Sequence, residues 1–280
     1  MRKSFLAVAA ALVTGVSLAS PAASAGPRDV AISVTRIGGD TGSAQPFVDR
    51  FLRYVEGAIG WPAGSAKGSF LTTRKAVTAF VAANKPGIGM MDPPLFFEMR
   101  KEWDLKPLMQ VESKDLVSPR LHVVVKDPGI RSLADLKGRR VHTTLGDYPR
   151  YLSKVVLGGQ VDAGTDWQLK HVGQALKGIR NVLRGDADAT LLDDEQLASA
   201  RQIEGGGDLR TIFTSSALPA IPVVEFGSSL PPADRDAFVK AMLAMCGSAA
   251  GAAICKEMHI GRFVPLDKPA LDAALTRYGQ

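Results

Sequence analysis

Cysteine is scarce in this sequence, with two among 280 residues. Two cysteines exclude a disulfide-rich scaffold and are too few for a zinc or iron–sulfur site built on thiolates. Long hydrophobic runs are lacking beyond the N-terminal segment, which excludes a polytopic membrane protein. The composition, 46% hydrophobic and 22% charged, excludes a disordered chain and a collagen-like repeat. The length therefore indicates one large globular domain or two lobes of ordinary size.

The N-terminal segment has the features of a secretory signal peptide. Arg2 and Lys3 provide positive charge, residues 5–18 are apolar, and an Ala-Ser-Ala sequence ends at Ala25. The apolar run is about 14 residues long, short of the ~20 that a membrane-spanning helix needs. The residue directly after the cleavage sequence is Gly26 and not a cysteine, so a lipid anchor is not expected. We predict that residues 1–25 are removed and that the mature chain lies in the periplasm.

Positive charge is in slight excess and is spread along the chain. The formal net charge is +6, and it becomes +4 without the signal peptide because lysine plus arginine falls from 34 to 32 against 28 acidic residues. The longest basic block is residues 137–140. Nucleic-acid binding needs a concentrated basic surface. We therefore expect no nucleic-acid partner.

Strand-like apolar runs alternate with helical patterns, which is typical of an α/β protein. Strands are expected at residues 30–36, 88–91, 121–125, 140–144, 167–172, 189–192, 209–214 and 223–226. Helices are expected at residues 47–59, 73–83, 132–138, 174–184 and 193–203, near Pro93 and Pro149, and through most of the chain after Pro232.

Two proline-containing extended stretches, residues 118–125 and 215–224, bracket a complete α/β set. If both cross between lobes, residues 26–120 with 222–280 form one lobe and residues 121–221 form the other. A ligand would then bind in the cleft, where strand ends and helix N-termini face each other.

The two cysteines, Cys246 and Cys255, are nine residues apart in a helical region. In an oxidising compartment we expect a disulfide between neighbouring helices. Two free buried thiols are the alternative.

Motifs of known enzymes are missing. The sequence has no Gly-x-Ser-x-Gly elbow, no His-Glu-x-x-His and no Walker lysine loop. His122 and His142 lie in expected strands, where a hydrogen-bonded core histidine is the expected role. The acidic run at residues 193–195 is interpreted as the start of a helix. We predict that the chain is not an enzyme and holds neither cofactor nor metal.

Four segments carry a family resemblance. They are Ser132–Val141 (Ser-Leu-Ala-Asp-Leu-Lys-Gly-Arg-Arg-Val), Gly185–Thr190, Ile88–Phe96 and Ile212–Val224. With them the sequence resembles the periplasmic solute-binding proteins of the type 2 fold, in the phosphate/phosphonate-binding branch of ABC importers.

This resemblance implies an α/β fold of two lobes, each a mixed sheet flanked by helices. It implies reversible capture of a small ligand by hinge closure and delivery to an ABC permease, with the chain acting as a monomer. Two alternatives stay open: a sensory protein that presents its ligand to a receptor kinase, and an exported enzyme on the same fold.

Loops that precede helices are the candidate ligand site, because helix N-termini offer unpaired N–H groups to oxyanions. The candidate residues are Thr41, Ser43, Asp92, Thr143, Thr144, Gly146 and Tyr148. An oxyanion such as phosphonate or phosphate is the ligand that the resemblance implies. Asp147, Asp40 and Asp92 would repel it, so ligands with an amine or several hydroxyls are the alternative.

Overall fold

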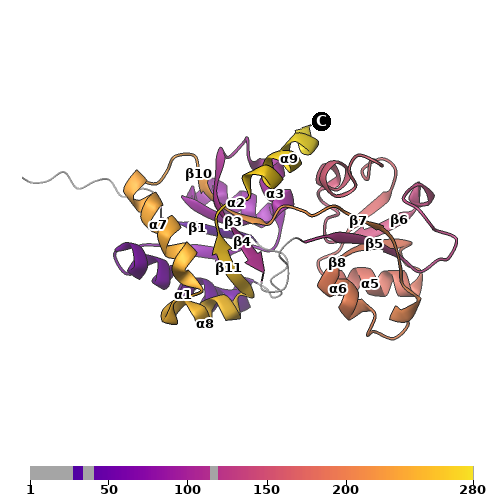
Figure 1. Cartoon of the computed structure of the whole chain (residues 1–280), viewed down its shortest axis with the longest axis horizontal. Helices are drawn as coiled ribbons and strands as arrows, with labels where there is room; N and C mark the ends of the chain where they lie inside the picture. Colours follow the sequence, from indigo (N-terminus) through magenta and orange to yellow (C-terminus); the bar gives the residue numbers. More distant parts are fainter. Residues whose placement is uncertain (1–27, 34–40, 114–118, 280) are drawn as a thin grey trace, which may run out of the picture.

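The computed structural model of the chain describes residues 28–33, 41–113 and 119–279. The expected signal peptide and Asp40 lie outside the described residues, so cleavage after Ala25 stays a prediction. The described residues form two mixed β-sheets flanked by helices, which lie next to each other along the long axis of the molecule (Figure 1). This is the two-lobed α/β arrangement expected from the sequence.

The first sheet has six strands in the order β11-β4-β10-β3-β1-β2. β1 runs parallel to β2 and β3, β10 is antiparallel to β3 and β4, and β11 is antiparallel to β4. The strands are β1 (Val30–Ser33), β2 (Gly68–Phe70), β3 (Ile88–Met91), β4 (Leu105–Ser113), β10 (Ile221–Phe226) and β11 (Ile260–Val264). The helices of this lobe are α1 (Thr41–Ile59), α2 (Arg74–Asn84), α3 (Pro93–Met99), α7 (Pro232–Met245), α8 (Ala249–Glu257) and α9 (Lys268–Gly279).

The second sheet has five strands in the order β7-β6-β8-β5-β9. β6 runs parallel to β7 and β8, whereas β5 is antiparallel to β8 and β9. The strands are β5 (Leu121–Val125), β6 (Arg140–Thr143), β7 (Gln168–His171), β8 (Ala189–Asp193) and β9 (Arg210–Thr214). The helical segments are η1 (Ala134–Leu136), α4 (Pro149–Tyr151), η2 (Leu152–Val156), α5 (Ala175–Arg184), α6 (Asp194–Ala200) and η3 (Gly206–Asp208).

The chain passes from the first sheet to the second between β4 and β5, and returns between β9 and β10. The lobe limits expected from the sequence, 26–120 with 222–280 and 121–221, stay a prediction.

Local sequence determines where the helices of the second lobe begin and end. The Asp193 carboxylate accepts a hydrogen bond from the Gln196 N–H (2.9 Å), and the Gln196 side chain accepts one from the Asp193 N–H (3.2 Å). This reciprocal capping box begins α6, in the acidic run where the sequence predicts a helix start. α5 ends at Gly185, whose φ of 79° lies in the left-handed region that glycine adopts readily.

Three strands of the first sheet, β2, β4 and β11, are not predicted by the sequence pattern. β4 contains Pro107, which has no N–H to donate and argues against a central strand. The sheet accommodates this proline beside a register shift between Val223 and Val224 of β10. β2 and β11 span three and five residues, which is too short for periodicity to identify them.

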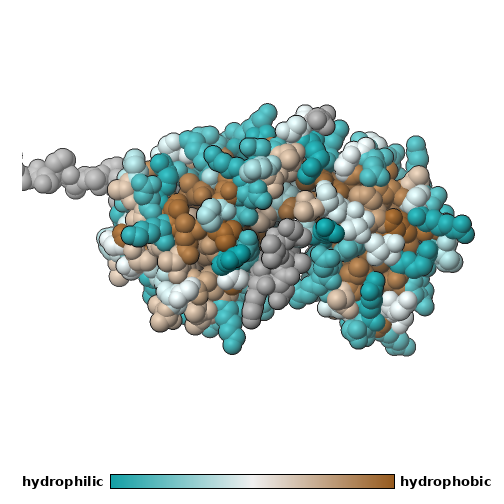
Figure 2. Space-filling model, in the orientation of Figure 1, coloured by the Kyte–Doolittle hydropathy of each residue, from teal (hydrophilic) through white to brown (hydrophobic). Residues whose placement is uncertain are grey.

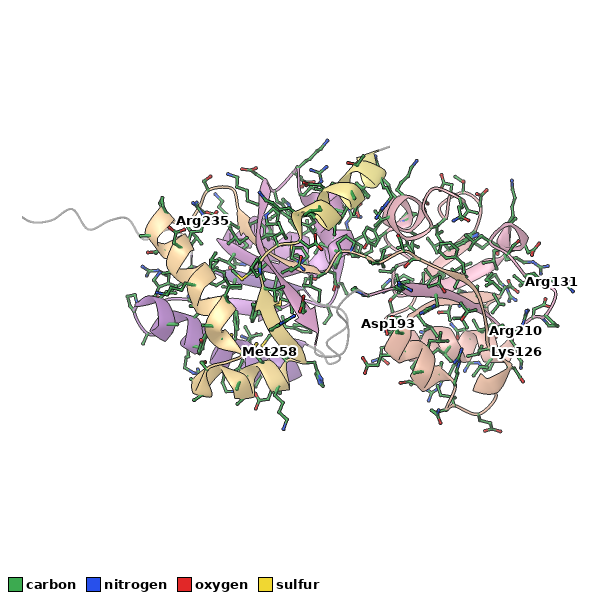
Figure 3. The ribbon with its side chains drawn as sticks, in the orientation of Figure 1. Lys126, Arg131, Asp193, Arg210, Arg235 and Met258 are labelled. Atoms are coloured by element: carbon green, nitrogen blue, oxygen red, sulfur yellow. A yellow bond between two sulfur atoms is a disulfide. The ribbon has the colours of Figure 1, made fainter. Side chains whose placement is uncertain are left out.

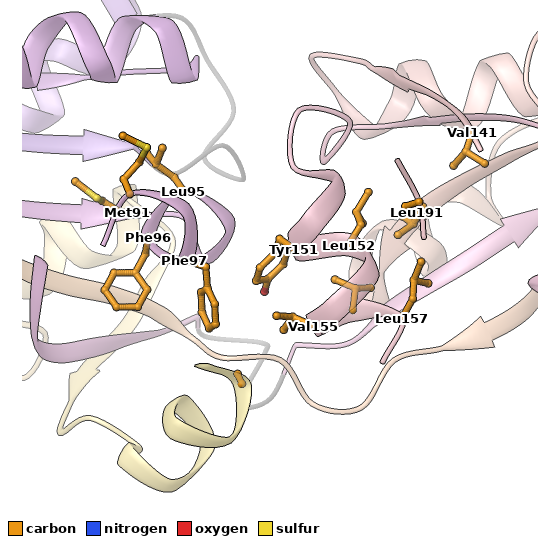
Figure 4. Packing of buried hydrophobic residues seen from close by; sticks show 14 of the residues in the cluster. Met91, Leu95, Phe96, Phe97, Val141, Tyr151, Leu152, Val155, Leu157 and Leu191 are labelled. Carbon is orange, nitrogen blue, oxygen red and sulfur yellow. The ribbon is translucent and has the colours of Figure 1, made fainter. Parts of the chain in front are cut away.

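Buried hydrophobic residues form three clusters. One belongs to the first lobe and contains Phe51 and Phe238, and a smaller one belongs to the second lobe and contains Ile179. The third spans both lobes, and in it Phe97 of α3 faces Tyr151 of α4 (Figure 4). On the face shown in Figure 2, hydrophilic residues cover much of both lobes, and hydrophobic residues gather in smaller patches on each lobe. The cluster that spans both lobes gives them an apolar contact in addition to the chain crossings.

The disulfide expected from the sequence is present. Cys246, at the end of α7, is bonded to Cys255 of α8, with 5.6 Å between their Cα atoms. Within the described ranges, no single helix is long and apolar enough to cross a membrane. α7 and α8 reach the required length and composition only as a pair, which is bent by 76°.

Candidate functional site: a cavity between the lobes

A cavity that is partly open to solvent lies where the two lobes meet. Ends of strands from both sheets and both crossing segments line it. The lining residues are Asp92, Pro93, Pro94, Val111, Pro119, Arg120, Leu121, Thr143, Thr144, Leu145, Tyr151, Leu191, Asp193, Gln196, Leu218, Pro219, Ala220 and Ile221. Most of these are apolar, as is usual for a small-molecule site.

The first lobe contributes the passage from β3 to α3. Asp92 follows the buried strand β3, and its N–H donates to the carbonyl of Ser33 at the end of β1 (2.7 Å). Pro93 and Pro94 then begin α3, where a missing N–H costs nothing. Asp92 is 6% exposed, so its carboxylate lies at the wall of the cavity and little of it reaches bulk water.

The second lobe contributes the turn after β6. The Thr143 hydroxyl accepts from the Leu145 N–H (3.2 Å), and the Thr143 carbonyl accepts from the N–H groups of Gly146 (3.2 Å) and Val172 (3.1 Å). These bonds hold the turn against the end of β7. They keep Thr143 and Thr144 at the cavity.

Gly146 supports this turn from outside the cavity. A Cβ atom at this position would lie 2.4 Å from the backbone nitrogen of His171. Real Cβ atoms do not approach so closely, so only glycine lets the turn pack on β7. Gly146 is therefore a packing residue of the site and does not line the cavity.

The second lobe also contributes the end of β8 and the start of α6. Asp193 is 3% exposed and lines the cavity together with Leu191 and Gln196. Asp193 caps α6 through its side chain. It also faces the cavity, because the carboxyl ends of strands in α/β sheets face the ligand cleft. In Figure 3, Asp193 lies on the side of the second lobe that faces the first.

The two crossing segments are hydrogen-bonded to each other. The Leu218 N–H donates to the Pro119 carbonyl (2.9 Å), and the Ser215 N–H donates to the Leu121 carbonyl (2.9 Å). The Leu121 N–H in turn donates to the Ser215 hydroxyl (3.0 Å). The segments therefore form a paired connection at one edge of the cavity.

Of the described residues that line the cavity, three carry charge: Asp92, Asp193 and Arg120. Arg120 is exposed, whereas both carboxylates are buried. Basic residues of the second lobe such as Lys126 and Arg210 lie at its far end (Figure 3). Within the described residues, the buried ionisable groups that line the cavity are thus the carboxylates of Asp92 and Asp193, both of which also interact with other parts of the chain.

Two tyrosines of the second lobe lie close to Asp92. Burial raises the pKa of Tyr151 far above its usual value, and the charge of Asp92 raises it further. Burial and the charge of Asp92 raise the pKa of Tyr148 in the same way. Both phenols are therefore neutral at physiological pH. Tyr151 lines the cavity, whereas Tyr148 packs beside the apolar cluster that spans the lobes.

The structure brings together three of the candidate ligand-binding residues, Asp92, Thr143 and Thr144. Gly146 and Tyr148 lie next to the site without lining it. Thr41 and Ser43 fall in the first turn of α1, and their side chains lie outside the described part of the chain.

Asp147 does not occupy the place expected from the sequence. Its carboxylate is 3.3 Å from Nδ1 of His171 on β7, and it does not line the cavity. The tight packing of Gly146 on β7 brings these two side chains together. Repulsion of an anion at the cavity by Asp147 is therefore not supported by the geometry.

Sequence reasoning misses Tyr151, Leu191, Gln196 and Val111 as lining residues. Leu191 and Val111 are strand residues that a pattern assigns to the core. Gln196 could be found from the capping box, since the residue three after a helix cap turns back toward that cap. The prolines of the crossing segments are visible in the sequence as extended connections.

The two strand histidines are hydrogen-bonded, as expected. His122 lies 2.9 Å from Thr214 Oγ1 and 2.9 Å from Asp194 Oδ1, and His142 lies 2.9 Å from the Asn181 side chain. Burial lowers the pKa of His142, which favours its neutral form. No group of three or more histidine, cysteine, aspartate or glutamate residues in the described ranges could hold a metal ion.

Residues 45–271 match the family described as ABC transporter, phosphonate, periplasmic substrate-binding protein. The chain belongs to this family. Its members bind a small molecule for an ABC transporter in the periplasm, and the family is not one of enzymes. The family expected from the sequence is thereby confirmed, whereas the monomeric state and a kinase partner stay predictions.

Solved structures show the same fold. The protein XAC2383 from Xanthomonas citri, bound to chloride ion, is 13% identical with a TM-score of 0.70 over 89% of this chain and 96% of that chain. A binding protein component of an ABC phosphonate transporter from Pseudomonas aeruginosa is 15% identical, with a TM-score of 0.64 over 88% and 83%. PhnD1 from Prochlorococcus marinus, in complex with methylphosphonate, is 12% identical, with a TM-score of 0.61 over 90% and 99%. No curated protein sequence matches the chain significantly.

Proposed function

We propose that this protein is exported to the periplasm, captures a small ligand in the cavity between its lobes, and delivers it to an ABC permease. One observation carries the proposal: strand ends of both sheets and both crossing segments line a single cavity. A rotation about the paired crossing segments would open this cavity to solvent. Closing it around a ligand would bury most of a small molecule.

The polar groups that line the cavity support a ligand that carries both a negative and a positive group. The Thr143 and Thr144 side chains, with the turn that follows β6, offer hydroxyl groups to an oxyanion. Asp92 and Asp193 line the walls of the two lobes, and because a carboxylate has about four acceptor sites, each can accept from a ligand amine besides its partners in the chain. We therefore propose a small zwitterion with an oxyanion and an amine, of the aminoalkylphosphonate class.

A thermal-shift series of matched compounds tests this proposal. Ethylphosphonate, 2-aminoethylphosphonate and ethylamine differ only in which charged group they carry. We expect 2-aminoethylphosphonate to raise the unfolding midpoint most. At about 100 times the Kd, binding adds about 2.7 kcal/mol, which corresponds to roughly 5–10 °C for a chain of this length.

The other outcomes of this series test the amine and the oxyanion of the proposed ligand separately. An equal shift with ethylphosphonate would remove the role of the amine, and shifts with ethylamine and polyamines alone would remove the oxyanion. If phosphate, phosphite, phosphonates, sulfonates, polyamines and thiamine-like compounds all leave the midpoint unchanged, capture of such a ligand is wrong.

Thr144→Ala tests the position of the ligand. The substitution removes a hydroxyl donor from the cavity wall, and we expect any compound that binds to lose about three- to tenfold in affinity. Thr72→Ala is the matched control, because Thr72 is exposed in a loop and does not line the cavity. Equal affinity of both variants and the wild type, measured by calorimetric titration, would place the ligand elsewhere.

A further inference from the structure

The C-terminal helix α9 begins on the first lobe. It follows β11, and the N–H of Asp267 donates to the side chain of Gln110 on β4 (2.9 Å). The Asp267 carboxylate then accepts from the N–H of Ala270 (3.0 Å), which caps the helix start. The first turn of α9 is therefore tied to the first sheet.

The other end of α9 binds the second lobe. Arg150 of α4 donates from Nη2 (3.0 Å) and Nε (3.3 Å) to the carbonyl of Tyr278 in the last turn. Its guanidinium also lies 4.8 Å from the centre of the Tyr278 ring, a favourable cation–π distance. A cation at the C-terminal end of a helix is also favoured by the helix dipole. In Figure 1, α9 extends from the first lobe toward the second.

Tyr278 is also joined to the cavity through aromatic contacts. The Phe97 ring of α3 lies 5.4 Å from the Tyr278 ring and 5.3 Å from the Tyr151 ring, both edge-on. Edge-on pairs at these distances are attractive beyond the area that they bury. Phe97 and Tyr151 are buried, and Tyr151 lines the cavity (Figure 4).

We infer that α9 is a clasp between the lobes, in which Tyr278 and Arg150 hold the lobes closed and position Tyr151 at the cavity. Tyr278 contacts Phe97 on the first lobe and Arg150 on the second. If α9 moves with the first lobe, opening separates Tyr278 from Arg150. If it moves with the second lobe, opening separates Tyr278 from Phe97. Every opening motion therefore breaks a contact of this residue.

Hinge closure alone does not require contacts between α9 and both lobes, and the clasp gives these contacts a role. The crossing segments connect the lobes whether the cavity is open or closed, whereas the contacts of Tyr278 exist only when α3 and α4 are close. They therefore bias the equilibrium toward the closed form without a ligand. A ligand that binds this form then needs less of its binding free energy for closure.

The inference rests on the hinge opening proposed above, but its test needs no ligand. Nitroxide labels on Leu176→Cys in α5 and Leu243→Cys in α7 report the distance between the lobes by pulsed electron paramagnetic resonance. Both leucines are exposed (38% and 40%), and they lie on different lobes. The two native cysteines are bonded to each other and take no label.

In the labelled wild-type background we expect one dominant distance. Tyr278→Ala and Arg150→Ala should each add a second population, with about a tenfold rise in the ratio of open to closed molecules. Tyr278→Phe keeps the ring and the backbone carbonyl, so it should resemble the wild type. Thr276→Ala is the control within α9, since Thr276 is exposed and its hydroxyl donates to the Asp272 carbonyl of its own helix.

Two results would overturn the clasp. Identical distance distributions in all variants would show that Tyr278 does not hold the lobes together, even if a ligand is later found. A second population in Tyr278→Phe as large as in Tyr278→Ala would exclude the ring contacts. If Tyr278→Ala fails to fold, Arg150→Ala decides the question, because Arg150 is exposed and its loss leaves the core intact.

Discussion

At the scale of single residues, Gly146 shows how a residue outside the cavity can shape it. Gly146→Ala would push the turn after β6 away from β7, because the new Cβ would lie 2.4 Å from the His171 nitrogen. We expect the free energy of unfolding to fall by about 1–3 kcal/mol and ligand affinity to fall with it. Urea denaturation followed by circular dichroism measures the first effect.

Gly173→Ala is the matched control, since no atom lies within 4 Å of a Cβ built there. A neutral or slightly stabilising effect is expected from the loss of unfolded-state entropy. If both alanine variants behave alike, close packing on β7 is not what requires glycine at position 146.

Single residues of the site can be predicted from the sequence where they directly follow an expected strand or precede an expected helix. Asp92, Thr143 and Thr144 follow buried strands directly, so their place at the cavity follows from the α/β arrangement. Tyr151 lies further along the chain, at the end of α4, and an apolar sequence pattern assigns its side chain to the core. Its position at the cavity depends on how the two lobes pack, which no local pattern contains.

At the scale of secondary-structure elements, a buried ion pair ties β10 to α7. The Glu225 carboxylate accepts from Arg235 (2.7 and 3.0 Å) and from the N–H of Leu230 (2.9 Å). Burial raises the pKa of Glu225, but the hydrogen bonds from Arg235 and Leu230 lower it by more, so the net shift is downward. A lowered pKa in the folded state means that ionised Glu225 stabilises the fold above its usual pKa of 4.5, and that this contribution is lost as pH falls.

Glu225→Gln should therefore lower the free energy of unfolding by about 2 kcal/mol at pH 7, since it weakens charge-assisted hydrogen bonds in a buried site. The difference from the wild type should shrink as the pH falls below about 4, where the wild-type carboxyl also becomes neutral. Urea denaturation at several pH values measures it, with exposed Glu102→Gln as the control. A difference that stays constant with pH would mean that the charge of Glu225 contributes nothing.

The disulfide fixes α8 to the end of α7. Cys246 and Cys255 close a short loop, so the double variant Cys246→Ser, Cys255→Ser should lose roughly 2–3 kcal/mol of stability. Mass spectrometry after alkylation should detect modified thiols only in reduced protein. Alkylation of the untreated native protein would contradict the bond.

Helices and strands are predicted correctly from the sequence where the apolar pattern and the length of the segment indicate the same kind of element. β8, with all five residues buried, and α6, which begins at a capping box, are both visible in the sequence. β4 is missed because Pro107 argues against a central strand, and only its partner β10 reveals the register shift that accommodates it. Strand partners are distant in sequence, so no local rule supplies them.

At the scale of the whole molecule, the family and the two lobes are confirmed, and export is the part that an experiment can settle directly. We expect the full chain, expressed in a Gram-negative host, to be recovered from the periplasm with Gly26 as its first residue. Intact mass measures this. Ala25→Phe is the control, because a large side chain at the cleavage sequence should block processing. Recovery of the uncleaved wild-type chain from the cytoplasm would contradict the signal peptide.

The hydrogen bonds between Pro119 and Leu218 and between Leu121 and Ser215 restrict how the molecule can move. These bonds join the described ends of the crossing segments beside the second sheet, so we expect these two ends to move together. We therefore expect the lobes to rotate about one axis that passes near this pair of chain segments. In Tyr278→Ala, single-molecule fluorescence should accordingly record two dwell levels with direct transitions between them, whereas the wild type should stay mainly at the closed level.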